Sequence, residues 1–169
     1  MFTLLFMHQI AYNQQKIDFT TYFESSLGKE TPNYKQTIEY CELLSQNSKY
    51  ISLSSIGVSP QGRKIPILIV DKNGLSSPTL IKASGRAIVF IQACVHAGEP
   101  DGKDAGFMLI RDIAISEKYL KWLDNISIVF MPIFNVDGHE RFSAFNRINQ
   151  NGPKEMGWRT TSKNYNLNR

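Results

Sequence analysis

Cysteine is scarce in this sequence, because Cys41 and Cys94 are the only two in 169 residues. Two cysteines are too few for a disulfide framework, which excludes the class of small disulfide-stabilised scaffolds. Both thiols are interpreted as buried core side chains, since a free cysteine behaves as a small apolar residue. Their number leaves the redox compartment of the protein open.

Two further absences concern partners. No apolar run approaches the roughly 20 residues that a membrane-spanning helix needs, so no membrane span is expected. Lysines and arginines are scattered along the chain, although its net charge is +4. A nucleic-acid-binding protein would show a basic stripe or a known module, so nucleic acid is not expected as a partner.

The length suits one domain, and the 42% of hydrophobic residues allow a core of useful size. Residues 1–30 are interpreted as an N-terminal segment and residues 31–169 as the domain. The stretch Phe2–Met7 is apolar, but no basic residue precedes it. It is therefore interpreted either as the remnant of a signal or as a frayed terminus. The localisation stays open, with a secreted or periplasmic one slightly favoured.

Helical and extended patterns alternate after this segment. The spacing of apolar residues predicts a helix over Pro32–Gln46, with Thr31 as its N-cap. Residues 50–59 and 65–74 predict two strands on either side of a turn that contains Pro and Gly. These strands are expected to form a hairpin or to be neighbours in one sheet.

The later segments are more apolar. Residues 86–95 and 126–135 are apolar on both faces, which indicates central strands that are covered on both sides. Residues 101–115 predict a helix between them. Together the elements predict an α/β fold with a mixed, mostly parallel central sheet and helices on both faces. After Asn135 regular structure is expected to fade.

The loop after the first of these strands carries a possible metal-binding pair. In α/β sheets ligands bind outside the carboxyl ends of the strands, and here His96 and Glu99 follow the strand end three residues apart. On a turn both side chains would point the same way. Imidazole and carboxylate are zinc ligands, and a hydrolytic zinc ion commonly has His, Glu and a second His. The alternative is a helix N-terminus at which Glu99 or Asp101 is a capping carboxylate.

Five segments, in order, resemble the zinc carboxypeptidase family of metallopeptidases, the M14-type group typified by the digestive carboxypeptidases. The resemblance extends from about Thr31 to the end of the chain. The segments are SPQGRKIPILIV, HAGE, FNVDGHERF (with Val136 where Pro is usual), GWR and NLNR. Each is weak alone, but their shared order favours the metal-binding interpretation of His96 and Glu99.

This resemblance implies roles for five residues. His96 and Glu99 would be ligands of one Zn²⁺ ion. Arg159 would polarise the scissile carbonyl and stabilise the oxyanion, which suits a fixed cation. Asn168 and Arg169 would hold the free carboxylate of the substrate, for which a planar guanidinium is well suited. The implied activity is hydrolysis at the C-terminus of a peptide or protein, and residues 31–169 would be the N-terminal part of the catalytic domain.

The family pattern is not complete in this sequence. The family also uses a third zinc ligand, a His, and a general-base Glu further along. Family position supports neither His8 nor His139 as that ligand. The chain by itself is therefore expected to bind zinc poorly and not to hydrolyse peptide. Asn166 stands where the family often has an Asp, and as an amide it would orient His96 but leave it less basic.

Several other polar residues are expected to have structural roles and not to contact substrate. Asn135, Asp137 and Gly138 are expected to shape a turn, and Arg141 and Arg147 to be surface or structural ion-pair partners. The truncated sheet is expected to expose an edge and an apolar face.

Two other functions are compatible with this sequence. One is a zinc deacylase or amidase that acts on N-acyl amino acids, which would also need a carboxylate clamp. The other is a non-catalytic pseudoenzyme or binding module that keeps the fold without the chemistry. A general-base Glu separates both enzymes from the binding module, and the preferred substrate separates the two enzymes from each other.

Overall fold

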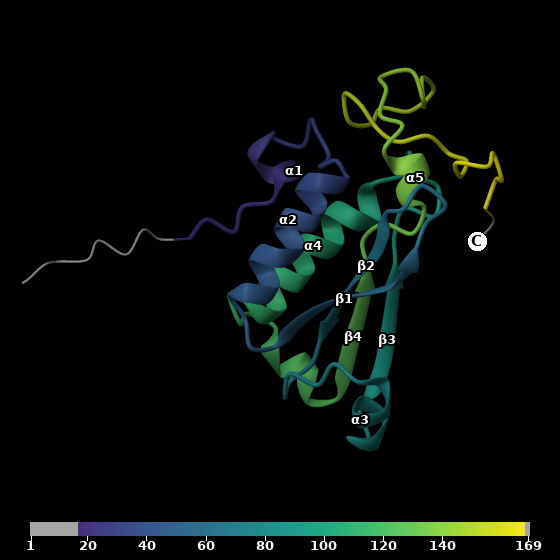
Figure 1. Ribbon diagram of the computed structural model, residues 1–169. Helices are drawn as coiled ribbons and strands as arrows, with labels where there is room; N and C mark the ends of the chain where they lie inside the picture. Colours follow the sequence, from purple (N-terminus) through teal and green to yellow (C-terminus); the bar gives the residue numbers. More distant parts are fainter. Residues whose placement is uncertain (1–16, 168–169) are drawn as a thin grey trace, which may run out of the picture.

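Four strands form one sheet in the computed structural model, which describes residues 17–167 (Figure 1). Their order across the sheet is β1-β2-β4-β3. The strands are β1 (Ile51–Val58), β2 (Lys64–Val70), β3 (Ala87–Gln92) and β4 (Ile126–Met131). The β1–β2 and β2–β4 pairs are antiparallel, and β3–β4 is parallel. The predicted hairpin and the mixed α/β class are confirmed, although the parallel part of the described sheet is smaller than expected.

Side chains of the central strands alternate between two cores, because successive residues of a strand point to opposite faces. On β2, Leu68 and Val70 pack with the larger core, whereas Ile67 and Ile69 belong to a smaller one. On β4, Ile128 and Phe130 belong to the larger core and Met131 to the smaller. These strands are buried on both faces, as their apolar sequences predict.

Helices α2 (Tyr34–Gln46) and α4 (Asp101–Ala114) cover the face that carries the larger core (Figure 1). The N-cap of α2 is Asn33 and not Thr31 as predicted. The Asn33 side chain accepts from the backbone N–H of Gln36, and the Gln36 side chain accepts from that of Asn33. This reciprocal capping satisfies two N–H groups that the first turn leaves unpaired.

Close contact between α4 and the sheet depends on Gly106. The Phe107 ring meets the rings of Tyr40 and Phe130 edge-on, with centroids 5.0 and 5.5 Å apart. A Cβ atom at Gly106 would overlap the Phe130 ring. The absence of a side chain therefore allows the helix to approach β4.

Four short helical elements were not predicted. They are α1 (Tyr22–Ser25), α3 (Pro78–Ala83), the 3-10 helix η1 (Leu120–Asp124) and α5 (Val136–His139). Each is too short for the periodicity of its apolar residues to stand out. The expectation that regular structure fades after Asn135 is wrong for the four residues of α5. No helix in residues 17–167 is both long and apolar enough to cross a membrane.

The position of β3 differs from the prediction. Residues 86–95 were expected to form a fully covered central strand, but β3 is at the edge of the described sheet. Ile88 and Phe90 are exposed, at 47% and 54%, and Val89 at 38%. The exposed edge and apolar face that the sequence predicts are both found on this strand.

Candidate functional site

The carboxyl ends of β3 and β4 bring two loops together at the rim of the sheet. Backbone pairing continues beyond the two strands, because Phe134 N–H donates to Ala93 C=O (3.1 Å) and Asn135 N–H to Cys94 C=O (3.1 Å). Cys94 has a φ of +50°, a left-handed conformation that is uncommon for a residue other than glycine. The chain thus turns sharply just before His96.

His96 and Glu99 come from one tight turn. Glu99 N–H donates to His96 C=O at 3.0 Å, and His96 Nδ1 lies 3.3 Å from Glu99 Oε1. The His96 side chain is buried and that of Glu99 is 25% exposed. Both residues line a hollow of about 200 Å³ together with Cys94 and Asp101. The predicted pair is therefore brought together and opens onto accessible space.

The other nitrogen of His96 is held by the backbone. His96 Nε2 lies 2.7 Å from Leu167 C=O, and a carbonyl can only accept, so Nε2 donates to it while Nδ1 faces the Glu99 carboxylate. Such a backbone partner fixes the tautomer of metal-binding histidines. Asn166, expected to orient His96, instead accepts from Arg159 Nε at 3.0 Å. The orienting contact comes from the next residue along the chain.

The donor atoms of the pair suit one zinc ion. Two ligands of a tetrahedral zinc, each at about 2.0 to 2.2 Å, are about 3.4 Å apart, which is close to the 3.3 Å between His96 Nδ1 and Glu99 Oε1. In residues 17–167 no cluster of three His, Cys, Asp or Glu side chains could hold a metal. The described residues therefore bring together two candidate ligands, His96 and Glu99, and not a set of three.

Two arginines converge on the Glu99 carboxylate. Arg159 Nη1 lies 3.6 Å and Arg147 Nη2 3.1 Å from Glu99 Oε1. The Arg159 side chain is 42% exposed, whereas that of Arg147 is 13% exposed. Arg147 is thus the ion-pair partner that the sequence suggested. Arg159 reaches the predicted site although it lies 60 residues after Glu99 in the chain. An arginine so placed presents a positive charge beside the His96–Glu99 pair.

Comparison with known proteins identifies the family of this chain. Residues 37–169 match the zinc carboxypeptidase family. The chain belongs to this family. Carboxypeptidase 2 of Trichophyton rubrum is 28% identical over 122 residues, which are 70% of this chain and 22% of that protein. Carboxypeptidase 2 of Trichophyton equinum is 26% identical over 123 residues.

Solved structures of carboxypeptidases share the fold. Carboxypeptidase A from Helicoverpa armigera has a TM-score of 0.57 at 18% identity, covering 84% of this chain and 34% of that one. A metallo-carboxypeptidase from Burkholderia cenocepacia has a TM-score of 0.56 at 20% identity, covering 80% and 31%. The chain thus spans about a fifth of the length of its curated relatives and about a third of these structures.

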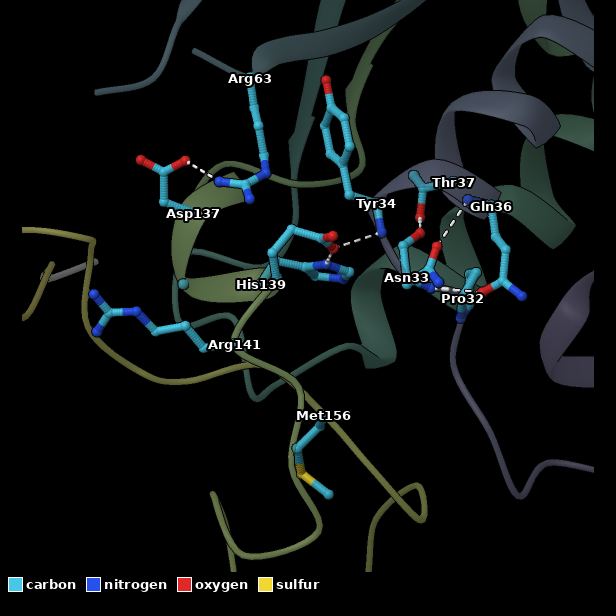
Figure 2. A network of polar contacts seen from close by, with 12 residues as sticks. Pro32, Asn33, Tyr34, Gln36, Thr37, Arg63, Asp137, His139, Arg141 and Met156 are labelled. Carbon is cyan, nitrogen blue, oxygen red and sulfur yellow. Dashed lines mark hydrogen bonds and ion pairs between the residues drawn. The ribbon is translucent and has the colours of Figure 1, made fainter. Parts of the chain in front are cut away.

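In this chain of the zinc carboxypeptidase family, His139 contacts Lys103. It is fully buried, and its Nε2 lies 2.9 Å from Lys103 Nζ. Burial and the neighbouring Lys103 lower the pKa of His139 to about 3. Figure 2 shows His139 on α5, beside the Arg63–Asp137 ion pair. His139 is a core residue in this arrangement and not a third ligand.

Sequence reasoning missed two buried charged residues of this region. Lys103 is buried in α4, where a lysine would ordinarily be assigned to a solvated helix face. Asp137 was assigned to a turn, but it collects hydrogen bonds from several segments. Neither has a signal in the local sequence. Three predicted residues, His8, Asn168 and Arg169, lie outside the described residues.

Proposed function

We propose that this protein acts as a zinc-dependent metallocarboxypeptidase, which removes residues from the C-terminus of a peptide or protein. The observation that carries the proposal is the meeting of His96, Glu99 and Arg159. His96 Nδ1 and Glu99 Oε1 are 3.3 Å apart, and Arg159 Nη1 is 3.6 Å from the same carboxylate oxygen. An imidazole, a carboxylate and a guanidinium thus meet at the rim of the sheet, which supports the proposal.

Each residue has a task that its chemistry suits. A zinc ion bound to His96 and Glu99 would activate a water molecule and polarise the carbonyl. Arg159, placed beside that point, would stabilise the negative charge that develops on the carbonyl oxygen. Asn168 and Arg169 would bind the carboxylate of the substrate, and the two oxygens of a carboxylate match the two-pronged guanidinium. Such a clamp restricts cleavage to chain ends.

The 169-residue chain by itself is proposed to be inactive. With two ligands among the described residues, zinc would be held weakly, since hydrolytic sites use three protein ligands. The missing ligand and the general base would come from sequence that this chain does not contain. Tight, stoichiometric binding of one zinc ion to the isolated chain would contradict this part of the proposal.

The test compares this chain with the protein expressed from the complete reading frame. In the latter, His96→Ala and Glu99→Gln should abolish zinc binding measured by calorimetry. Arg159→Ala should keep zinc and lower kcat/KM for a peptide by roughly 100- to 1000-fold. The matched control is Glu42→Gln, which changes an exposed carboxylate on α2 and should change neither quantity.

The substrate decides between the alternatives. Release of the C-terminal residue from a peptide supports the carboxypeptidase. Hydrolysis of an N-acyl amino acid with no action on peptides would make the protein a deacylase. Zinc binding without either activity would leave a binding module.

A further inference from the structure

Helix α5 lies against the backbone on both sides of Arg159. Trp158 N–H donates to Gly138 C=O at 2.8 Å, and the Asn135 side-chain amide donates to Arg159 C=O at 3.2 Å. These contacts fix the backbone that bears Arg159, while its side chain stays 42% exposed. The guanidinium therefore extends from an anchored backbone.

A third contact involves the Asp137 carboxylate. Ser162 Oγ donates to Asp137 Oδ2 at 2.9 Å, so the chain is also held three residues beyond Arg159. Asn135, Asp137 and Gly138 are hereafter called the α5 clamp. Asp137 is 2% exposed, which shields its hydrogen bonds from competing water.

The same carboxylate is anchored in turn by the loop between β1 and β2. Ser59 Oγ donates to Asp137 Oδ1 at 2.7 Å. Arg63 Nη1 donates to the same oxygen at 2.9 Å (Figure 2). Gln61 N–H donates to the other oxygen at 3.2 Å. Burial raises the pKa of Asp137, but the hydrogen bonds from Ser59, Ser162 and Arg63 outweigh burial and hold the pKa below its usual value. The carboxylate is therefore ionised and saturated with donors.

Gly138 allows the two backbones to touch. A Cβ atom there would lie 2.7 Å from Trp158 C=O and overlap Thr160 C=O. Any side chain at Gly138 would therefore push residues 158–160 away from α5. The clamp depends on glycine for close approach and not on an unusual φ.

We propose that the α5 clamp positions Arg159 beside the Glu99 carboxylate, with Asp137 as the residue that connects the Arg159 segment to the β1–β2 loop. The proposal rests on the proposed role of Arg159. Asp137 is a positioning residue, because it accepts from the Ser162 hydroxyl three residues beyond Arg159 and does not contact the Glu99 carboxylate. A loosened segment would leave Arg159 charged and present but not held at its 3.6 Å distance from Glu99.

The test uses the two tryptophans of the chain as probe and internal control. Both backbone amides are hydrogen-bonded, Trp158 to Gly138 C=O and Trp122 to Tyr119 C=O, but only Trp158 lies in the clamped segment. Selective ¹⁵N-tryptophan labelling reports hydrogen exchange of both amides in one sample. Ser162→Ala and Asp137→Asn should speed exchange at Trp158 by about tenfold, the effect of losing one hydrogen bond, and leave Trp122 unchanged.

Two control variants distinguish a local loss of the α5 clamp from a change in the stability of the whole protein. Ser162→Thr keeps the hydroxyl and should restore slow exchange at Trp158. Ser45→Ala removes a hydroxyl that donates to Glu42 C=O in its own helix, and it should change neither amide. Unchanged exchange at Trp158 in both clamp variants would overturn the proposal, as would equal acceleration at Trp158 and Trp122.

Activity of the protein from the complete reading frame distinguishes the two proposals. If Ser162→Ala lowers kcat with KM unchanged, the clamp positions Arg159 for the reaction. If Arg159→Ala lowers kcat but Ser162→Ala does not, the positioning role is wrong. If Arg159→Ala leaves kcat unchanged, the proposed role of Arg159 is wrong.

Discussion

Lys103 Nζ lies 2.9 Å from His139 Nε2 in the interior of the molecule, where both side chains are fully buried. Lys103 also donates to Pro32 C=O. One ammonium group thus joins α4, α5 and the start of α2. Since an ammonium only donates, His139 accepts at Nε2 and carries its proton on Nδ1, which faces Glu140 Oε1 at 3.5 Å.

This arrangement predicts that acid destabilises the protein through His139. The pKa of His139 in the folded protein is about 3, below the ordinary 6.5. Between pH 3 and pH 6.5, His139 is therefore protonated in the unfolded chain but not in the folded protein. Stability is therefore full above about pH 6.5 and falls as the pH drops towards 3. Between pH 7 and 5 the loss should be on the order of 2 kcal/mol, measured by urea unfolding.

The control for this prediction is His139→Gln, which removes the titrating group. Asp104, whose pKa burial raises to about 6, acts in the opposite sense but is present in both proteins. Identical pH dependence of unfolding in the two proteins would contradict the role of His139.

Lys103 and His139 are expected to be energetically coupled. Lys103→Met removes the donor and leaves Pro32 C=O and His139 Nε2 without a partner, which should cost about 1 to 3 kcal/mol of unfolding free energy. His139→Phe should cost a similar amount, because it leaves a buried ammonium with one acceptor fewer. The double variant should lose less than the sum of the two single losses, by more than about 0.5 kcal/mol. If the losses of unfolding free energy in the two single variants simply add up in the double variant, measured by denaturant unfolding, then the Lys103–His139 contact does not stabilise the protein.

The packing of α4 on β4 predicts different outcomes at two glycines. Gly106→Ala would force a methyl group into the Phe130 ring and should lower the unfolding free energy by about 1 to 3 kcal/mol. Gly57→Ala is the matched control, because a Cβ there meets nothing within 4 Å, and its effect should be within about 0.5 kcal/mol. Thermal unfolding of the two variants beside the parent protein measures both, and equal stability of the two would refute the packing argument.

The exposed edge strand predicts self-association of the 169-residue chain. Ile88, Val89 and Phe90 lie on β3 with 38 to 54% of each residue accessible, and an unpaired apolar strand is a template for pairing with another chain. Phe90→Lys should lower the weight-average mass measured by light scattering at high concentration. Ile148→Lys, which changes an 82% exposed residue outside the sheet, should not. A monomer at all concentrations would contradict the prediction.

Sequence patterns predicted the elements whose signal is local. The α2 and α4 helices and the β1–β2 hairpin follow from apolar spacing and turn residues over 7 to 14 positions. The His96–Glu99 pair was found for the same reason, since three residues along one turn fix the distance between the side chains. The choice of Asn33 over Thr31 as N-cap was missed, because both residues can cap a helix and the sequence does not show which one the chain turns at.

Features that depend on residues far apart in the chain were not predictable. The apolar sequence of β3 predicts burial on both faces, but its burial depends on which strands lie beside it and not on its own residues. Lys103 and Asp137 are buried because their partners arrive from Pro32, Ser59 and other distant segments. Only the folded chain shows that these charges are satisfied.

The hydrogen bonds of Asp137 have a consequence for how the protein folds. They join residues separated by 78 positions on one side and 25 on the other, and contacts between distant residues form slowly because long loops must close first. The β1–β2 hairpin can form early from neighbouring residues, whereas the Arg159 segment becomes ordered only once both the hairpin and α5 are in place. During synthesis, we therefore expect the nascent chain to form its β1–β2 hairpin before the Arg159 side chain is held beside Glu99.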